Sequence, residues 1–137
     1  MSRAGYSHRT LVEKLGIRPG DKIAIIGAPA GYRKTLGPLP PDVRNPGPNT
    51  TNLDFTQLFV RDRKALVDQL RDLRKHIKPT GMIWVSWPKQ ASGVPSDLTE
   101  DVIRTVAIET GLVDVKVAAI DETWSGLKLV IRVKDRL

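Results

Sequence analysis

The chain has 137 residues, which is enough for one domain with a substantial hydrophobic core and too few for two ordinary domains, so we expect a single domain over residues 1–137. Hydrophobic residues make up 40% of the chain, as in folded proteins, and 22 Lys and Arg against 15 Asp and Glu give a net charge of +7, which favours anionic partners. The sequence has no cysteine, two histidines and no apolar stretch of membrane-spanning length, which excludes disulfides, thiolate metal sites and cysteine nucleophiles and favours a cytoplasmic protein with no membrane contact and no bound metal.

One short helix and one buried strand are predicted in the first part of the chain. Thr10 and Glu13 have the spacing of a capping box, and Gly16 is placed to end the helix that they begin, over residues 10–15. The apolar run over residues 22–27 is rich in isoleucine and predicts a strand that is covered on both faces.

Little regular structure is expected between this strand and residue 52. Residues 28–52 contain six of the ten prolines of the chain, and proline removes backbone donors and breaks helices. One helical turn near residues 32–36 and one extended piece near residues 42–45 are the most that fits there.

A strand, a helix and a strand follow in the order that implies parallel pairing. Residues 53–60 form the second predicted strand and residues 82–87 the third. Between them an apolar stripe predicts an amphipathic helix that Pro79 and Gly81 stop. The stripe consists of Leu66, Leu70, Leu73 and Ile77. Such a unit predicts a right-handed crossover.

One more helix and an antiparallel hairpin are predicted to close the chain. Asp97 with Glu100 begins the helix, Gly111 ends it, and its apolar stripe consists of Val102, Ile103, Val106 and Ala107. Residues 113–120 and 127–133 are strands whose connection is short enough for a hairpin. The element order therefore predicts an α/β fold with a mixed sheet of about five strands, mostly parallel, with a C-terminal antiparallel hairpin.

Two segments resemble the class I S-adenosylmethionine-dependent methyltransferases. The stretch Gly16-Ile-Arg-Pro-Gly-Asp-Lys-Ile-Ala-Ile-Ile-Gly is similar to the entry into the first strand of that fold, and residues 73–83 are similar to the passage into its fifth strand. The whole chain resembles a small bacterial family of unknown function, with Trp84-Val-Ser-Trp-Pro-Lys, Asp97-Leu-Thr-Glu-Asp and Asp121-Glu-Thr-Trp-Ser-Gly-Leu-Lys among the similar segments. The resemblance implies a three-layer, Rossmann-like, methyltransferase-like fold that is truncated to its later half.

The resemblance also implies where a cofactor would lie, at the loop that contains Gly27, Ala28, Pro29 and Gly31. That fold binds S-adenosylmethionine with a glycine-rich loop after the first strand, an acid within that strand and a second acid at the tip of the next strand. Here Pro29 replaces the middle glycine, and residues 23–26 contain no acid. Proline removes a backbone donor and fixes φ, so we expect no cofactor, with S-adenosylmethionine bound through an altered loop as the alternative.

The segment over residues 84–93 is the first candidate ligand site, because it leaves the carboxyl end of a strand. Its candidate residues are Ser86, Trp87, Lys89 and Ser92, whose ring, hydroxyls and ammonium group suit a planar or anionic ligand. Strand geometry places Trp84 and Ser86 on one face and Trp87 on the other. We expect both tryptophans to pack in the core, whereas a structural and a ligand-binding role both stay open for Lys89 and Ser92.

The connection of the hairpin is the second candidate ligand site. It contains Trp124 and Ser125 beside Asp121 and Glu122. Acids, serine and glycine are ordinary turn residues, so we do not expect the two acids to act as acid or base.

Three basic residues at the end of the predicted long helix, Arg71, Arg74 and Lys75, are the candidates for nucleic-acid binding. Acids alternate with basic residues along this helix, which favours an ordinary solvated face.

The sequence contains no phosphate-binding loop, no nucleophile elbow and no zinc-binding helix motif, so no catalytic residue is assigned. We therefore expect a non-catalytic or vestigial methyltransferase-like domain that binds a partner protein or a small ligand at the carboxyl edge of its sheet. An S-adenosylmethionine-dependent methyltransferase and a nucleic-acid-binding protein are the alternatives.

Overall fold

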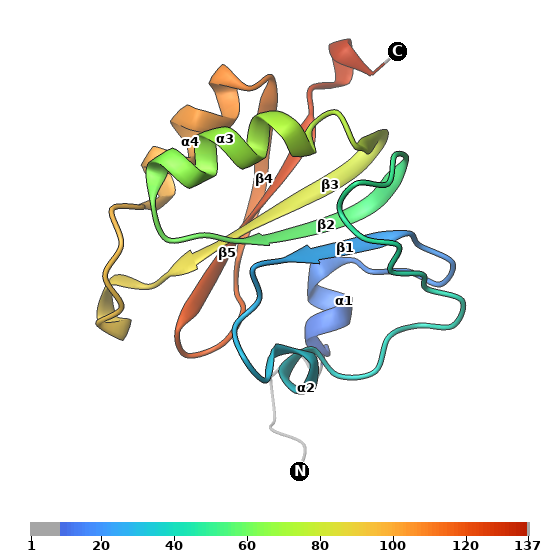
Figure 1. Ribbon diagram of the computed structural model, residues 1–137, viewed down its shortest axis with the longest axis horizontal. Coiled ribbons are helices and arrows are strands. Elements are labelled where there is room, and N and C mark those ends of the chain that lie inside the picture. The colour runs from blue at the N-terminus through green and yellow to red at the C-terminus, as the bar shows by residue number, and fades with distance from the viewer. Residues whose placement is uncertain (1–8, 137) are drawn as a thin grey trace.

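A five-stranded sheet forms the middle layer of the protein (Figure 1). The computed structural model describes residues 9–136. The strands are β1 (Ile23–Ile26), β2 (Leu53–Phe59), β3 (Ile77–Pro88), β4 (Leu112–Ala119) and β5 (Trp124–Ile131), and the α-helices are α1 (Leu11–Leu15), α2 (Tyr32–Leu36), α3 (Arg63–Leu73) and α4 (Glu100–Glu109). Short 3-10 helices span Gln90–Ser92 and Val133–Asp135.

The strands lie side by side in the order β1, β2, β3, β5, β4. β1 pairs with β2 and β2 with β3 in parallel, whereas β5 is antiparallel to both β3 and β4. The expected hairpin is present, with its second strand inside the sheet and its first strand at the edge. The prediction of a mostly parallel sheet is therefore confirmed only for β1, β2 and β3. The short turn after β4 brings β5 back antiparallel beside β4.

Helices cover both faces of the sheet, α3 and α4 on one face and α1 and α2 on the other (Figure 1). Because side chains alternate along each strand, they build two cores. The core under α3 and α4 contains Leu70, Val85 and Ile103, and the core under α1 and α2 contains Leu15 and Trp84. The opposite faces expected for Trp84 and its neighbours in β3 are thereby confirmed.

Side-chain caps begin the helices α1, α3 and α4. The capping box of α1 is confirmed, since the Thr10 hydroxyl accepts the Glu13 N–H at 3.2 Å and the Glu13 carboxylate accepts the Thr10 N–H at 2.9 Å. The expected cap of α4 is wrong, because the Thr99 hydroxyl caps this helix. Asp97 instead accepts the Arg63 N–H at 2.8 Å and so joins the loop before α4 to the first turn of α3.

The boundary between α3 and β3 also differs from the sequence prediction. α3 ends at Leu73, and Ile77 is the first residue of β3 instead of the last of the helical stripe. Ile77 is buried where it pairs with Leu53 of β2, and this tertiary contact overrides the helical spacing. Pro79 and Gly81 therefore lie within β3, beside a shift in its register with β2, where a strand tolerates them.

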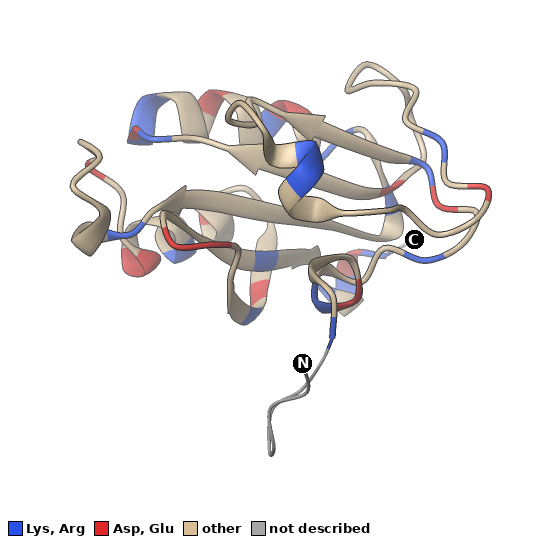
Figure 2. Cartoon of the chain, turned by 90° about the horizontal axis from the view of Figure 1, so that it is seen from below, with Lys and Arg blue, Asp and Glu red and all other residues tan. Residues whose placement is uncertain are grey.

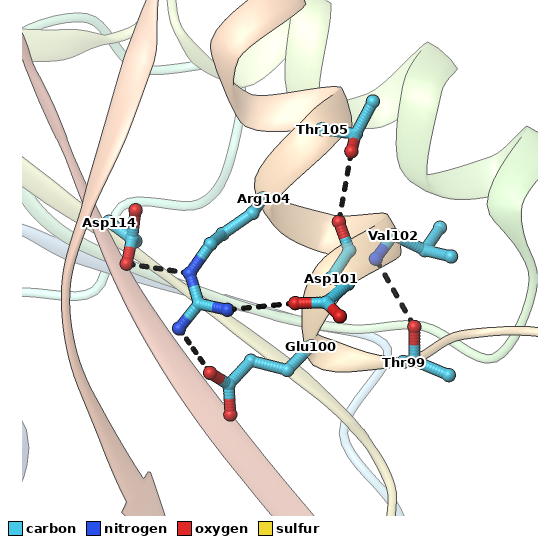
Figure 3. Close-up of polar contacts among 7 residues, drawn as sticks. All are labelled: Thr99, Glu100, Asp101, Val102, Arg104, Thr105 and Asp114. Atoms are coloured by element: carbon cyan, nitrogen blue, oxygen red, sulfur yellow. Dashed lines mark hydrogen bonds and ion pairs between the residues drawn. The ribbon is translucent and has the colours of Figure 1, made fainter.

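An ion pair between Arg104 and Asp114 joins α4 to β4 (Figure 3). The Arg104 Nε donates to Asp114 of β4 at 2.9 Å, its Nη1 donates to Asp101 at 3.1 Å, and its Nη2 donates to Glu100. Hydrogen bonds to Asp114 and Glu100 raise the pKa of Arg104 above its ordinary value, so the guanidinium keeps its charge. The two acids in the first turn of α4 are also well placed for the helix dipole.

Within residues 9–136 every helix is too short or too polar to cross a lipid bilayer. The same residues include no group of three or more His, Asp or Glu side chains that could hold a metal ion.

Candidate functional site

The parallel strands β1, β2 and β3 end at the same edge of the sheet (Figure 1). A cleft of about 620 Å³ opens at these carboxyl ends. It is formed by the turn after β1, the junction of β2 and α3, the loop before α4 and the turn between β4 and β5. The residues that line it are Gly27, Pro29, Phe59, Val60, Arg61, Asp62, Ala65, Gln69, Val94, Thr123 and Trp124. Open α/β sheets bind their ligands at this edge.

The turn after β1 is packed tightly against the end of β2. Gly27 has a φ of +72°, and a Cβ at this position would lie 2.8 Å from the Phe59 carbonyl oxygen. Gly31 has a φ of +81°, but no atom lies within 4 Å of a Cβ placed there. The packing of two strand ends therefore requires glycine at position 27, independently of any ligand.

Three aromatic rings stand in a row beside the cleft. Tyr32 and Phe59 meet edge to face with ring centroids 4.7 Å apart, and Phe59 and Trp124 do so at 5.0 Å. Tyr32 and Phe59 are buried, whereas Trp124 is half-buried and lines the cleft. The row thus ends in an aromatic surface that a ligand can reach.

A chain of buried hydrogen bonds joins α2 to the sheet. The Tyr32 hydroxyl donates to Gln57 Oε1 at 2.6 Å, and Gln57 Nε2 donates to Ser86 Oγ at 3.1 Å. Gln57 and Ser86 are fully buried, and burial raises the pKa of Tyr32 well above its ordinary value, so its hydroxyl stays a donor. Ser86, a candidate for ligand binding, thus has a structural partner.

The variant Tyr32→Phe is expected to change how stability depends on pH. At neutral pH it should be less stable by about 1–3 kcal/mol, because the buried Gln57 Oε1 loses its donor. In the unfolded chain this tyrosine ionises at about pH 10, whereas in the folded protein it stays neutral to higher pH. Above that pH the wild type therefore loses stability through this group, and the variant does not. Urea unfolding of both proteins from neutral to strongly alkaline pH should show the gap narrowing, and a constant gap would contradict this role.

The carboxylates beside the cleft are bonded to nearby backbone. Asp62 Oδ1 accepts the Ala65 N–H at 2.8 Å as the cap of α3. Asp121 Oδ1 accepts the N–H groups of Thr123 and Trp124, each at 2.8 Å, and so closes the turn between β4 and β5. Both acids stabilise the walls of the cleft, as is typical of capping and turn residues.

Lys89 and Ser92 stabilise the loop after β3. The Lys89 Nζ donates to the Asp121 carbonyl oxygen at 2.6 Å, which ties this loop to the turn of the hairpin. The Ser92 Oγ donates to the Lys89 carbonyl oxygen at 2.6 Å and accepts the Val94 N–H at 3.2 Å. Both side chains have structural partners, and neither lines the cleft.

Trp87 and Ser125 lie on neighbouring strands, where they are paired in register. Trp87 is 7% exposed and Trp84 is completely buried, so the expected core packing of both tryptophans is confirmed. Trp87 lines a separate hollow of about 500 Å³ together with residues 93–100.

The candidates of the loop after β1 are divided between two hollows. Gly27 and Pro29 line the cleft, whereas Ala28 and Gly31, again with Pro29, line a hollow of about 600 Å³ against α2. The loop therefore separates two surfaces instead of enclosing one pocket.

The basic candidates near the end of α3 have different surroundings. Arg71 and Lys75 are exposed, whereas Arg74 is half-buried and its Nε would lie 3.1 Å from a Cβ at Gly111. Arg74 thus packs at the carboxyl end of α4, where a cation is favourable. Lys and Arg lie on several separate elements with Asp and Glu among them (Figure 2).

Eight of the residues that line the cleft are absent from the sequence-based candidates: Phe59, Val60, Arg61, Asp62, Ala65, Gln69, Val94 and Thr123. Position is the signal that indicates the residues from Phe59 to Gln69, because the end of a parallel strand and the first turns of the next helix lie at the ligand-binding edge. Arg61 is exposed, and among the described residues its side chain has no hydrogen bond or ion pair. Its guanidinium is therefore available to a ligand.

Residues 49–133 match the model of a family described as "Protein of unknown function (DUF3052)". Among curated protein sequences none matches the chain. An S-adenosylmethionine-dependent methyltransferase from Aquifex aeolicus is 11% identical with a TM-score of 0.62, and the match covers 88% of each chain. Magnesium protoporphyrin IX methyltransferase from Synechocystis PCC 6803, solved with bound S-adenosylmethionine, is 10% identical with a TM-score of 0.57 over 88% of this chain and 74% of that one. The expected methyltransferase-like fold is thereby confirmed.

The residues at the carboxyl edge do not match the donor set that this fold uses for S-adenosylmethionine. β1 contains no acid, and the chain passes from β1 through α2 to β2 without a further strand to carry a second acid. Pro29 has no N–H, and its carbonyl oxygen accepts the Tyr32 N–H at 3.1 Å. The protein therefore has a methyltransferase-like fold without the donor residues that the resemblance implies for S-adenosylmethionine.

Proposed function

We propose that the chain, which belongs to the family described as protein of unknown function (DUF3052), is a non-catalytic, methyltransferase-like domain. In this proposal it binds a small planar ligand with an anionic group. The ligand lies in the cleft at the carboxyl edge of the sheet. The observation that carries the proposal is that a half-buried tryptophan ring, Trp124, and an unpaired guanidinium, Arg61, line the same cleft.

Trp124 provides the planar contact. The Phe59 ring at 5.0 Å and the Asp121 turn hold it in place, so little side-chain freedom is lost when a ligand binds. Val60 and Ala65 add apolar walls, and a ring between them and Trp124 is removed from water.

Arg61 provides the charge. Its planar guanidinium suits bidentate hydrogen bonds to a carboxylate or phosphate. The amino end of α3 offers little to an anion, because Asp97 and Asp62 already accept the N–H groups of Arg63 and Ala65. Selection of an anionic ligand therefore falls to Arg61.

Binding is favoured over methyl transfer because Asp62 and Asp121 hold the walls of the cleft and have backbone partners. A group that moves a proton during a reaction must be free to reach the substrate. Methyl transfer from S-adenosylmethionine is the second candidate, and the position of the Gly27 turn at the end of β1, beside the cleft, favours it.

NMR titration of the ¹⁵N-labelled protein with adenosine monophosphate and with indole-3-acetate tests the proposal. We expect saturable shifts for Trp124 and its neighbours, and weaker binding of adenosine, which lacks the charge. The variants Trp124→Leu and Arg61→Gln should each weaken binding by about tenfold, the size of one stacking contact or one charge-assisted hydrogen bond.

Arg71→Gln is the matched control, because Arg71 is an exposed arginine of α3 that does not line the cleft. It should leave the affinity unchanged. The proposal fails if neither planar anion produces saturable shifts in the cleft, or if Arg71→Gln weakens binding as much as Arg61→Gln does.

A further inference from the structure

Two lysines lie side by side on neighbouring strands of the sheet, away from the cleft. Lys128 of β5 pairs in register with Lys116 of β4 on one side and with Trp84 of β3 on the other. Residues directly opposite in antiparallel strands point to the same face with Cβ atoms about 5 Å apart, so both ammonium groups project from the face that bears Trp84. Like charges at such a pair are destabilising.

Arg18, in the loop between α1 and β1, adds a third positive charge. This loop passes beside β3, because a Cβ at Gly16 would lie 3.5 Å from the Met82 side chain. Burial lowers the pKa of Lys128, and the charges of Lys116 and Arg18 lower it further. Three different elements thus bring three cations into one electrostatic cluster.

Acidic side chains do not neutralise this cluster. Among residues 9–136, Arg18, Lys116 and Lys128 have no side-chain ion pair or hydrogen bond. The nearby Asp21 carboxylate accepts the backbone N–H of Arg18 at 2.9 Å. The remaining residues at the amino end, 1–8, contain neither Asp nor Glu.

Folding accounts for Lys116 but not for Lys128. A lysine on an edge strand such as β4 prevents unwanted strand pairing. Lys128 lies on an interior strand, is half-buried, and occupies a position where an apolar side chain could pack beside Trp84. A lysine that costs stability and has no structural partner points to a ligand.

We propose that Arg18, Lys116 and Lys128 form a binding site for a phosphate group. Their donors match the oxygens of a phosphate, and a bound anion removes the repulsion within the cluster. The half-buried Val113 and Val130 lie on the same face and give the site an apolar border. None of these residues lines the cleft, so this site is independent of the ligand proposed there.

Calorimetric titration with inorganic pyrophosphate at low ionic strength tests the site. We expect saturable binding that Lys128→Gln and Lys116→Gln each weaken by about tenfold or more, as for the loss of one charge-assisted hydrogen bond. Lys64→Gln, which removes an exposed charge from α3, should have little effect. No saturable binding, or equal losses in all three variants, would overturn the proposal.

Thermal unfolding without ligand gives a second readout. Lys128→Gln should unfold at a higher temperature than the wild type, because the repulsion is relieved, while it binds pyrophosphate less tightly. If Lys128 only stabilised the fold, its replacement would lower the unfolding temperature and leave the affinity for pyrophosphate unchanged. That result would contradict the site.

A single-stranded RNA oligonucleotide distinguishes two sources of the phosphate. RNA that binds more tightly than pyrophosphate, and that loses affinity in Lys128→Gln, identifies a nucleic-acid backbone as the source. Pyrophosphate binding without RNA binding identifies a small phosphorylated compound. Both results support the phosphate site.

Discussion

Replacing Trp84 with alanine is expected to lower the free energy of unfolding by about 3–5 kcal/mol, as for other large residues removed from a core. Trp84 is completely buried between α1 and the middle of the sheet, and its Nε1 donates to the Leu15 carbonyl oxygen at 2.8 Å. That oxygen lies at the carboxyl end of α1, where no intrahelical donor remains. The substitution therefore leaves both a cavity and an unpaired carbonyl group.

Urea unfolding followed by circular dichroism measures this loss without relying on tryptophan fluorescence. Trp124→Ala is the matched control, because Trp124 is half-buried at the rim of the cleft and should cost much less stability. Equal losses from the two substitutions would contradict the assignment of Trp84 to the core and Trp124 to the site.

The second large loss of stability is expected for substitutions in the turn after β1. Gly31→Ala should cost about 1–2 kcal/mol, because its φ of +81° is unfavourable for a residue with a Cβ. Gly27→Ala has the same backbone cost and also brings a Cβ to 2.8 Å from the Phe59 carbonyl oxygen, so we expect a further loss of about 1–3 kcal/mol. The difference between the two variants isolates the close approach of the strand ends.

Chemical denaturation of both variants, with no ligand present, is the relevant measurement. If Gly27→Ala were as stable as Gly31→Ala, the packing explanation for this glycine would fail, and a role in holding a ligand would be the remaining reason for it.

Local sequence rules predict the elements of this fold well where neighbouring residues decide the structure. The capping box at Thr10, the run of isoleucines in β1 and the strand, helix, strand order are all present. The rules fail at Ile77, since helical spacing continues past the true end of α3 and only pairing with Leu53 reveals a strand. Asp97 is a similar case, because its partner is 34 residues away.

The site is harder to predict for the same reason. The partners of Lys89 and Ser86, which decide that these side chains are structural, lie 32 and 29 residues away in the sequence. Arg61 and Phe59 carry no motif, and only their position at the end of a parallel strand indicates the cleft. The Lys116 and Lys128 pair depends on a hairpin register that shifts after Asp114, which alternation alone does not reveal.

We propose that this protein combines the fold of a methyltransferase with a cleft that does not bind the methyl donor. Calorimetric titration of the purified protein with S-adenosylmethionine, and with S-adenosylhomocysteine as a second ligand, tests this most directly. We expect no saturable heat up to millimolar concentrations of either compound. Micromolar binding that Trp124→Leu weakens would contradict the claim and would make methyl transfer the leading function.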